Sequence, residues 1–347
     1  MQFIPDALRQ LVRFPLLDDR GLADDLAARM RADVARLGVE VTGIIQFRRG
    51  DSKIVAHATH PIWGACIAKW ISPELALGSA LTHVETTRRL TAHEGSLLPR
   101  VLHYGPHFTV EECVVGRSLD VLTEAEWATV DLPAFHRALR RFSESSASDE
   151  RLTTVDTRLI LNFYLKKLYL RTRHLNVGER IALRLRLIGQ GRELRQRIHA
   201  ARRALAAISL PRLTAHNDLG AQNVILEEGT GALRVIDVEH TRPGHYLFDC
   251  LWMLVSATRV RSSMAVLEAT YGQLGSDDFT GVEGAGNVAR RMLAFMLELE
   301  VMMRPGRHAG PLLALVDRDI RTTSGARSTV PVAPPPPRAS PRPTAEV

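Results

Sequence analysis

The strongest constraint in this sequence is a loop followed by two short β-like runs and an aspartate. Asp218 and Asn223 lie in the loop, with Asn223 five positions after Asp218. Residues 224–226 and 233–236 flank a turn with two glycines, a pattern that predicts a β-hairpin. Asp237 comes directly after the second run. Because a hairpin brings its two ends together, we expect Asn223 and Asp237 to lie close to each other.

Phosphoryl transfer is a chemistry that needs these side chains in this arrangement. A carboxylate accepts the proton of the acceptor hydroxyl, and oxygen ligands hold Mg²⁺ against the triphosphate. We therefore assign Asp218 as the candidate catalytic base, and Asn223 and Asp237 as the candidate metal ligands. The alternative is that Asp218 and Asn223 only cap a turn, since both residue types favour turns through their own hydrogen bonds.

A cation is also needed on the phosphates, and Lys69 is the candidate. It lies in the apolar run Ile-Ala-Lys-Trp at 67–70, within a β-like segment. We expect Glu85 in the following helical stretch to pair with Lys69, and Glu74 is the alternative partner. The competing interpretation of Lys69 is a strand lysine that extends to solvent.

The order of β-like and helical segments predicts an α+β chain with two lobes. We expect a helical extension at 1–38, a small lobe with an antiparallel sheet and one main helix at 39–113, and a larger, mainly helical lobe at 114–325. The Pro-rich tail at 326–347 lacks apolar residues to bury and is expected to be disordered. The segments behind this prediction are a helical run at 21–37, β-like runs at 41–49, 53–59 and 64–70, a helical run at 73–93, and extended segments at 100–105 and 108–116.

The loop, the hairpin and the Ile-Asp pair after it resemble the protein-kinase superfamily. His-Asn-Asp-Leu-Gly at 216–220, Ile-Asp-Val-Glu at 236–239 and the later Phe248-Asp249 are more similar to the aminoglycoside phosphotransferase and choline kinase family. The resemblance covers residues 40–320. It implies a bilobal protein-kinase-like fold, with ATP and Mg²⁺ as cofactors and a small-molecule hydroxyl as the phosphoryl acceptor.

The resemblance also implies roles for residues around the loop. Asp249 and His216 are expected to support the catalytic loop structurally. Ser52 lies in the turn Gly-Asp-Ser-Lys at 50–53, which resembles a Gly-x-Ser loop whose backbone and serine donors approach the phosphates. Glu239 either helps to shape the metal site or is exposed.

The link between the lobes is expected at Glu111, Glu112 and Cys113. In the related family, backbone groups of this link meet the adenine, so Glu112 and Cys113 are candidate cofactor-binding residues. Their side chains, like that of Glu111, are expected to take no part.

The chain departs from protein kinases in four ways. Asn217 stands where protein kinases have the arginine that reads a phosphorylated activation loop, Asp-Val-Glu replaces Asp-Phe-Gly, no triple-glycine motif precedes Lys69, and the sequence has no Ala-Pro-Glu segment. The first departure argues against regulation by activation-loop phosphorylation.

Charge bears on the partners of the chain. Its 347 residues carry a formal net charge of +7, and residues 158–203 hold thirteen Lys or Arg against two Glu. This bias favours a neutral or anionic acceptor, such as a sugar, a phosphorylated metabolite or a lipid-linked headgroup, over a polycationic antibiotic. The same basic helices offer a surface for peripheral membrane contact. The alternative is that they only face solvent.

Two other function classes stay open. The first is a catalytically silent kinase-like nucleotide-binding module, against which the joint presence of Lys69, Asp218, Asn223 and Asp237 argues. The second is a nucleic-acid-binding protein that uses the arginine-rich helices. Aromatic residues make up only 5% of the chain, and no zinc-finger spacing occurs, so no specific nucleic acid is expected.

Cysteine spacing and hydropathy complete the expectations. The three cysteines are far apart, which argues against a disulfide framework and a cysteine zinc site. No signal peptide and no transmembrane run are evident in the sequence, so we expect a cytoplasmic protein.

Overall fold

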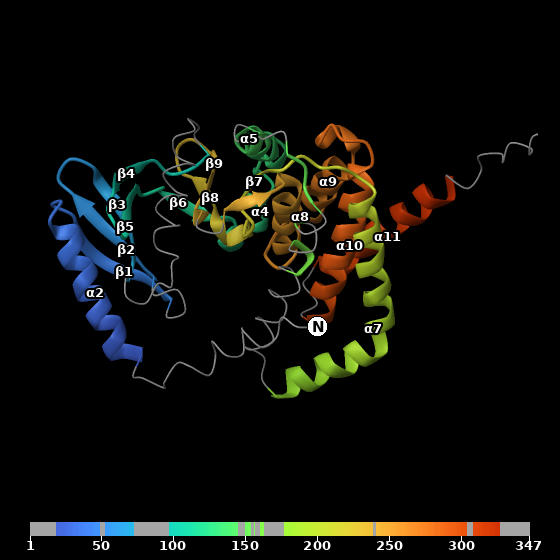
Figure 1. The fold of residues 1–347 in the computed structure, drawn as a ribbon, viewed down its shortest axis with the longest axis horizontal. Coiled ribbons are helices and arrows are strands. Elements are labelled where there is room, and N and C mark those ends of the chain that lie inside the picture. The colour runs from blue at the N-terminus through green and yellow to red at the C-terminus, as the bar shows by residue number, and fades with distance from the viewer. Residues whose placement is uncertain are drawn as a thin grey trace, which may run out of the picture.

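The computed structural model describes a chain of two lobes (Figure 1). The small lobe carries an antiparallel sheet and the large lobe is mainly helical, so the predicted α+β, protein-kinase-like architecture is confirmed. The expected helix at 73–93 and the tail from 327 lie outside the described residues, and the domain boundaries stay predictions. The structure describes residues 19–48, 53–72, 97–144, 150–153, 156, 160–162, 177–238, 241–303 and 308–326.

The small lobe is built on a five-stranded antiparallel sheet. Its strand order is β1-β2-β3-β5-β4, so neighbouring strands in the sheet are mostly neighbours in sequence. Val55 of β2 and Thr109 of β5 flank Lys69 of β3 in the sheet register. The strands are β1 (Glu40–Arg48), β2 (Lys53–His60), β3 (Gly64–Ile71), β4 (Val101–Tyr104) and β5 (Phe108–Glu112).

One face of this sheet packs against helix α2 (Asp19–Ala35), which lies on the side away from the large lobe (Figure 1). Side chains alternate along a strand, so every second residue of β2 and β3 turns to the helix. Lys53 and Lys69 occupy the alternate positions of these strands and therefore belong to the opposite face. Trp70 adds a hydrogen bond to the helix, because its Nε1 donates to Asp33 Oδ2 at 2.8 Å. The apolar layer consists of Leu26, Ala27, Met30 and Val34 of the helix, Val39 directly before the sheet, and Ile54, Ala56, Ala58, Cys66, Ala68, Trp70, Phe108 and Val110 of the sheet.

The chain passes between the lobes over residues 113–115. The extended segment predicted at 108–116 is in fact β5 followed by a short strand, β6 (Gly116–Ser118), that belongs to a different sheet. β6 pairs with β8 (Val224–Glu227), and β8 pairs with β9 (Leu233–Val235). The predicted hairpin, β8 and β9, is therefore confirmed. Its first strand, β8, pairs with β6, the segment by which the chain enters the large lobe.

A second connection joins the stretch before β4 to the large lobe. The amide of Val235 donates to Leu97 O at 2.7 Å, and Arg234 Nη2 donates to Leu98 O at 2.8 Å. Both donors lie in β9. The β4 side of the small lobe is thus attached directly to the hairpin of the large lobe.

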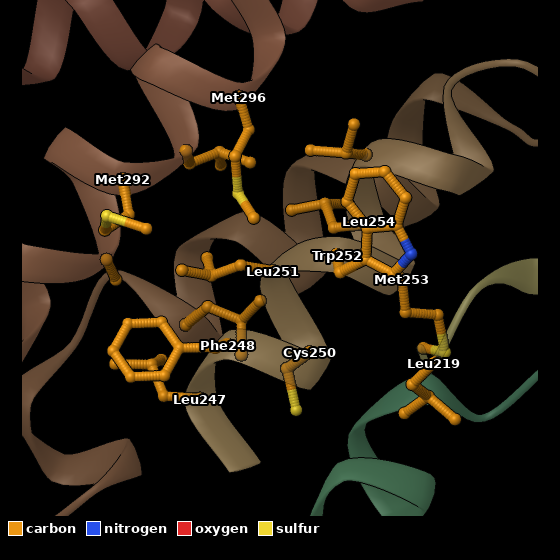
Figure 2. Packing of buried hydrophobic residues seen from close by; sticks show 14 of the residues in the cluster. Leu219, Leu247, Phe248, Cys250, Leu251, Trp252, Met253, Leu254, Met292 and Met296 are labelled. Atoms are coloured by element: carbon orange, nitrogen blue, oxygen red, sulfur yellow. The ribbon is translucent and has the colours of Figure 1, made fainter. Parts of the chain in front are cut away.

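The core of the large lobe forms around helix α8 (Tyr246–Ala257), every residue of which is buried. Figure 2 shows Leu247, Phe248 and Leu251 of this helix beside Met292 and Met296 of α10 (Ala285–Met303). The other helices are α4 (Glu124–Trp127), α5 (Leu132–Glu144), α7 (Val177–Ala206), α9 (Met264–Leu274) and α11 (Ala309–Ala326), with 3₁₀ turns η1 (Leu119–Val121), η2 (Ala221–Asn223) and η4 (Asp277–Phe279) and the strand pair β7 (Leu213–Ala215) and β10 (Arg242–Gly244).

Among the helices that the structure describes, none has the length and apolar character needed to span a bilayer.

Two buried histidines of the large lobe should make stability depend on pH. Burial lowers the pKa of His136 to about 4, although its hydrogen bond with Gln273 opposes the shift. Burial, helped by the positive charge of Arg140, lowers the pKa of His245 to about 3. In the unfolded chain both histidines take up a proton near pH 6.5. Below that pH the unfolded state therefore binds more protons than the folded state, and the folded state loses relative stability.

We expect the free energy of unfolding to fall by about 1.4 kcal/mol per pH unit for each histidine as the pH drops from 6.5 towards 4. Denaturant titrations at pH 7, 6 and 5 measure this slope. His136→Gln should reduce the slope by the share of one histidine, whereas the same change at the exposed His57 should leave it unaltered. Equal slopes for the wild type and His136→Gln would contradict the prediction.

Candidate active site

The catalytic loop begins at the end of β7 and is held by a buried carboxylate. Asp249 lies in the first turn of α8, and its side chain accepts the backbone amide of His216 through Oδ2 and that of Asn217 through Oδ1, both at 2.7 Å. Asp249 is only 1% exposed. Both carboxylate oxygens thus accept hydrogen bonds from the start of the loop, and the supporting role of Asp249 stays a prediction.

His216 ties the loop to the strand that leads to Asp237. Its Nδ1 accepts the amide of Asp218 at 3.2 Å, so Nε2 carries the proton and donates to Ile236 O at 3.0 Å. The ring is therefore placed as a structural bridge between two segments of the site. This arrangement favours the structural role that the resemblance implied for His216.

Asn223 closes the loop. Its Nδ2 donates to Asp218 O at 2.8 Å, and the amide of Ile236 donates to Asn223 O at 3.0 Å. The hairpin therefore brings Asn223 next to Ile236 and Asp237, as the sequence predicted. Because the amide nitrogen is engaged by Asp218, the amide oxygen is the group of Asn223 that can bind a cation.

Two residues of the site adopt left-handed backbone conformations without being glycine. Asn217 and Asp237 each have φ of 64°. Asn and Asp tolerate this region better than other residues with side chains, and such conformations concentrate at functional sites. Here they turn the chain directly before Asp218 and at the metal-ligand candidate itself.

Asp237 faces Lys53, which is not among the site residues predicted from the sequence. Lys53 Nζ lies 2.7 Å from Asp237 Oδ1, and the two side chains are 3% and 13% exposed. Lys53 stands at the start of β2, on the same sheet face as Lys69. The signal was present in the sequence, because Lys53 alternates with the apolar residues Ile54, Ala56 and Ala58 as Lys69 alternates with Ala68 and Trp70.

Lys69 is paired with Glu111 of the neighbouring strand β5. Lys69 Nζ lies 2.7 Å from Glu111 Oε2, and the side chains are 7% and 5% exposed. Thr109 Oγ1 donates to the other oxygen of Glu111 at 3.1 Å. The expectation that the Glu111 side chain takes no part is therefore wrong, because strand pairing places it beside Lys69. The expected partner Glu85 and its alternative Glu74 lie outside the described residues, as do Ser52 and Glu239.

Glu112 spans the junction of the lobes. Its carboxylate contacts Arg234 of β9 and lies 3.9 Å from Arg100 Nε, and its amide donates to Arg100 O at 2.9 Å. Side chain and amide are thus engaged, and the prediction that Glu112 meets the nucleotide now concerns its carbonyl group. Cys113, half-buried at the crossing between the lobes, stays a predicted cofactor-binding residue. Burial raises the pKa of its thiol.

The two lobes enclose a pocket at this junction. Lys69 and Glu111 reach it from the small lobe, and Asp237 reaches it from the large lobe. The structure therefore brings the proposed phosphate-binding lysine and a proposed metal ligand to one cleft. The remaining lining residues are Leu98, Pro99, Val101, Ile236 and Val238.

The donor set suits a magnesium ion that arrives with a nucleotide. The amide oxygen of Asn223 and the carboxylate of Asp237 are hard oxygen donors, which Mg²⁺ prefers. No cluster of three or more His, Cys, Asp or Glu with metal-binding geometry occurs among the described residues. Mg²⁺ commonly takes one or two protein ligands and completes its shell with phosphate oxygens and water, so the residues fit this ion.

Comparison with known proteins points to one family. The family model described as "Phosphotransferase enzyme family" matches residues 64–284. A search of curated protein sequences finds no match to this chain.

Solved structures share the fold at low sequence identity. Macrolide 2′-phosphotransferase MphH from Brachybacterium faecium is 14% identical with a TM-score of 0.51, and the match covers 88% of this chain and 99% of that one. Aminoglycoside phosphotransferase APH(4)-Ia is 12% identical with a TM-score of 0.50, over 86% and 99%. An ethanolamine kinase from Plasmodium vivax is 14% identical with a TM-score of 0.45, over 84% of each chain. The first two similarities establish the fold.

Removing the Asp249 carboxylate should loosen the catalytic loop. Asp249→Ala leaves two buried amides without their acceptor, and we expect the free energy of unfolding to fall by about 3 kcal/mol. Asp249→Asn keeps the shape and one acceptor oxygen, so its loss should be smaller. Denaturant titration measures both changes. An Asp249→Ala variant as stable as the wild type would show that the loop does not depend on this residue.

Proposed function

The chain belongs to the phosphotransferase enzyme family, and from this premise we propose that it transfers the γ-phosphoryl group of ATP to a hydroxyl group of a small molecule. The observation that carries the proposal is the convergence of Asp218, Asn223 and Asp237 on one loop and hairpin, with Asp237 across a pocket from Lys69. Asp218 is partly exposed, as a base that meets an incoming acceptor must be.

The reaction proposed is a direct transfer. Asp218 orients the acceptor hydroxyl and takes its proton while the hydroxyl oxygen forms a bond to the γ-phosphorus. The bond between that phosphorus and the β–γ bridging oxygen breaks, and ADP leaves. Lys69 neutralises charge on the phosphates, and Glu111 holds the ammonium in place. Asn223 and Asp237 would hold Mg²⁺, which when bound supplies electrostatic stabilisation of the phosphate charge.

The preference for a neutral or anionic acceptor rests on the net charge of the protein, because the described arginines of α7 do not line the pocket. Arg192, Arg195, Arg202 and Arg203 of α7 are exposed, and none of them lines the pocket described above. Arg197 points inward and is neutralised by acidic residues, with Asp317 at 2.6 Å and Glu298 at 3.4 Å. A net charge of +7 still favours anionic molecules over cationic ones near the surface.

Peripheral membrane contact is a finer part of the proposal, and the exposure pattern of α7 supports it. The start of this helix projects away from α10 and α11 (Figure 1). Val177, Ile181, Leu185 and Ile188 repeat at helical spacing and are 73%, 54%, 64% and 81% exposed. Further along the same helix face come the exposed arginines just named. An apolar stripe next to basic side chains suits the surface of an anionic bilayer.

Replacing the proposed base should abolish turnover and spare nucleotide binding. For Asp218→Asn we expect a fall in turnover of about 10²–10⁴-fold, because the hydroxyl proton loses its acceptor. The assay is ADP release across a panel of hydroxyl acceptors, with ATP affinity measured in parallel. Asp278→Asn, at an exposed aspartate of η4, is the matched control. Near-full activity of Asp218→Asn would refute the assigned base. A wild type that binds nucleotide but turns over no acceptor would instead indicate a silent binding module.

If α7 contacts a membrane, replacing one of its exposed apolar side chains should reduce the amount of protein that co-sediments with vesicles. The wild type should bind vesicles containing phosphatidylserine more tightly than pure phosphatidylcholine vesicles. Ile188→Glu should weaken that binding about tenfold, because one apolar side chain can no longer be buried. Ile62→Glu changes an equally exposed isoleucine in the turn between β2 and β3 and should have no effect. Equal binding by all three proteins would exclude α7 as the contact.

A further inference from the structure

Lys53 is a buried ammonium group whose position no step of the proposed reaction yet explains. It begins β2, opposite Ile71 of β3, and its side chain is 3% exposed. A buried ammonium is stable only when an anionic or hydrogen-bonding partner compensates its charge. One such partner is Asp237, at 2.7 Å and 184 positions further along the chain. The contact therefore joins the small lobe to the proposed metal ligand of the large lobe.

The choice of lysine at this position is informative. The chain contains four lysines among 45 basic residues, so its other basic side chains are arginines. Two of the four, Lys53 and Lys69, are buried on the same face of the small-lobe sheet. Lysine offers a compact charge on a flexible stem, which can change partners over a short distance more readily than a planar guanidinium. Both side chains are thus suited to bind phosphate oxygens that enter the cleft.

Asp237 cannot compensate an ammonium and a divalent cation at the same time. Two cations held by one carboxylate repel each other in a region that water hardly reaches. If Mg²⁺ alone displaced Lys53, the ammonium would remain buried and would lose its contact with the Asp237 carboxylate. Phosphate oxygens resolve this conflict, because they compensate both cations together.

We propose that Lys53 is a second phosphate-positioning residue, which occupies Asp237 in the nucleotide-free protein and moves to the nucleotide phosphates when Mg²⁺ takes the carboxylate. The proposal builds on the function proposed above. It implies that the metal ion and the nucleotide bind with positive coupling, and that Lys53 is the source of this coupling. It also implies that nucleotide binding exchanges a direct contact between the lobes for one through the phosphates.

The test measures binding without turnover. Mg²⁺ is titrated calorimetrically into the nucleotide-free protein, and AMP-PNP, a non-hydrolysable ATP analogue, is titrated with and without Mg²⁺. For Lys53→Met we expect Mg²⁺ alone to bind about tenfold more tightly and AMP-PNP with Mg²⁺ to bind about tenfold more weakly. Arg36→Met removes one charge from a side chain that lies directly after α2 and is 79% exposed, and this variant should behave as the wild type.

The outcomes separate this proposal from the proposed function. If the wild type binds AMP-PNP with Mg²⁺ and Lys53→Met binds both ligands as the wild type does, the role of Lys53 is refuted and the kinase assignment stands. If the wild type binds no nucleotide, the proposed function itself fails. A purely structural ion pair would lower the unfolding temperature of Lys53→Met and leave the coupling between Mg²⁺ and AMP-PNP unchanged, which would also overturn the proposal.

A second variant covers the case in which Lys53→Met does not fold. Asp237→Asn removes the competing carboxylate and leaves the ammonium to the phosphates. We expect this variant to bind AMP-PNP in the absence of Mg²⁺ about tenfold more tightly than the wild type. Metal-free affinity equal to or below that of the wild type would refute the exchange of partners.

Discussion

The geometry of the active site depends on the carboxylate of Asp249, which is buried away from bulk solvent. Asp249 sits in a helix whose every residue is buried, and two backbone amides and the helix N-terminus help to compensate its charge. Those two amides belong to the residues directly before Asp218. The Asp249 side chain thus links the apolar packing of α8 to the placement of Asp218, because it belongs to the buried helix and holds the two residues before Asp218. At its other end the loop is fixed by the hairpin, through Asn223 and Ile236.

The charged side chains of the cleft neutralise one another in pairs. Lys69 pairs with Glu111 within the small lobe, and Lys53 pairs with Asp237 across the two lobes. Each pair is largely shielded from solvent, so neither charge can be left alone without a considerable cost. A triphosphate with its metal ion would enter a site whose charges are already oriented, which is the condition for strong electrostatic catalysis.

The sequence allowed much of this arrangement to be predicted. The spacing from Asp218 to Asn223 and the hairpin before Asp237 are local features, and local features follow from turn and strand preferences. The pairings of Glu111 with Lys69 and of Lys53 with Asp237 join residues 42 and 184 positions apart. Such partners are set by strand register and by how the lobes meet, which a single sequence does not reveal. The division of 108–116 into strands of two different sheets has the same cause, because both halves favour extended backbone.

The attachment of β9 to the stretch before β4 bears on how the cleft can move. Leu97 and Leu98 are bonded to the hairpin of the large lobe, and Glu112 contacts Arg234 of the same strand. The β4–β5 edge of the small lobe is thus mechanically part of the large lobe. The far strands β1 and β2 are joined to the large lobe through the contact of Lys53 with Asp237. A rigid rotation about the interlobe crossing would break the contacts of β9, whereas a twist within the sheet that lifts the β1–β2 ribbon would keep them and break the contact of Lys53 with Asp237.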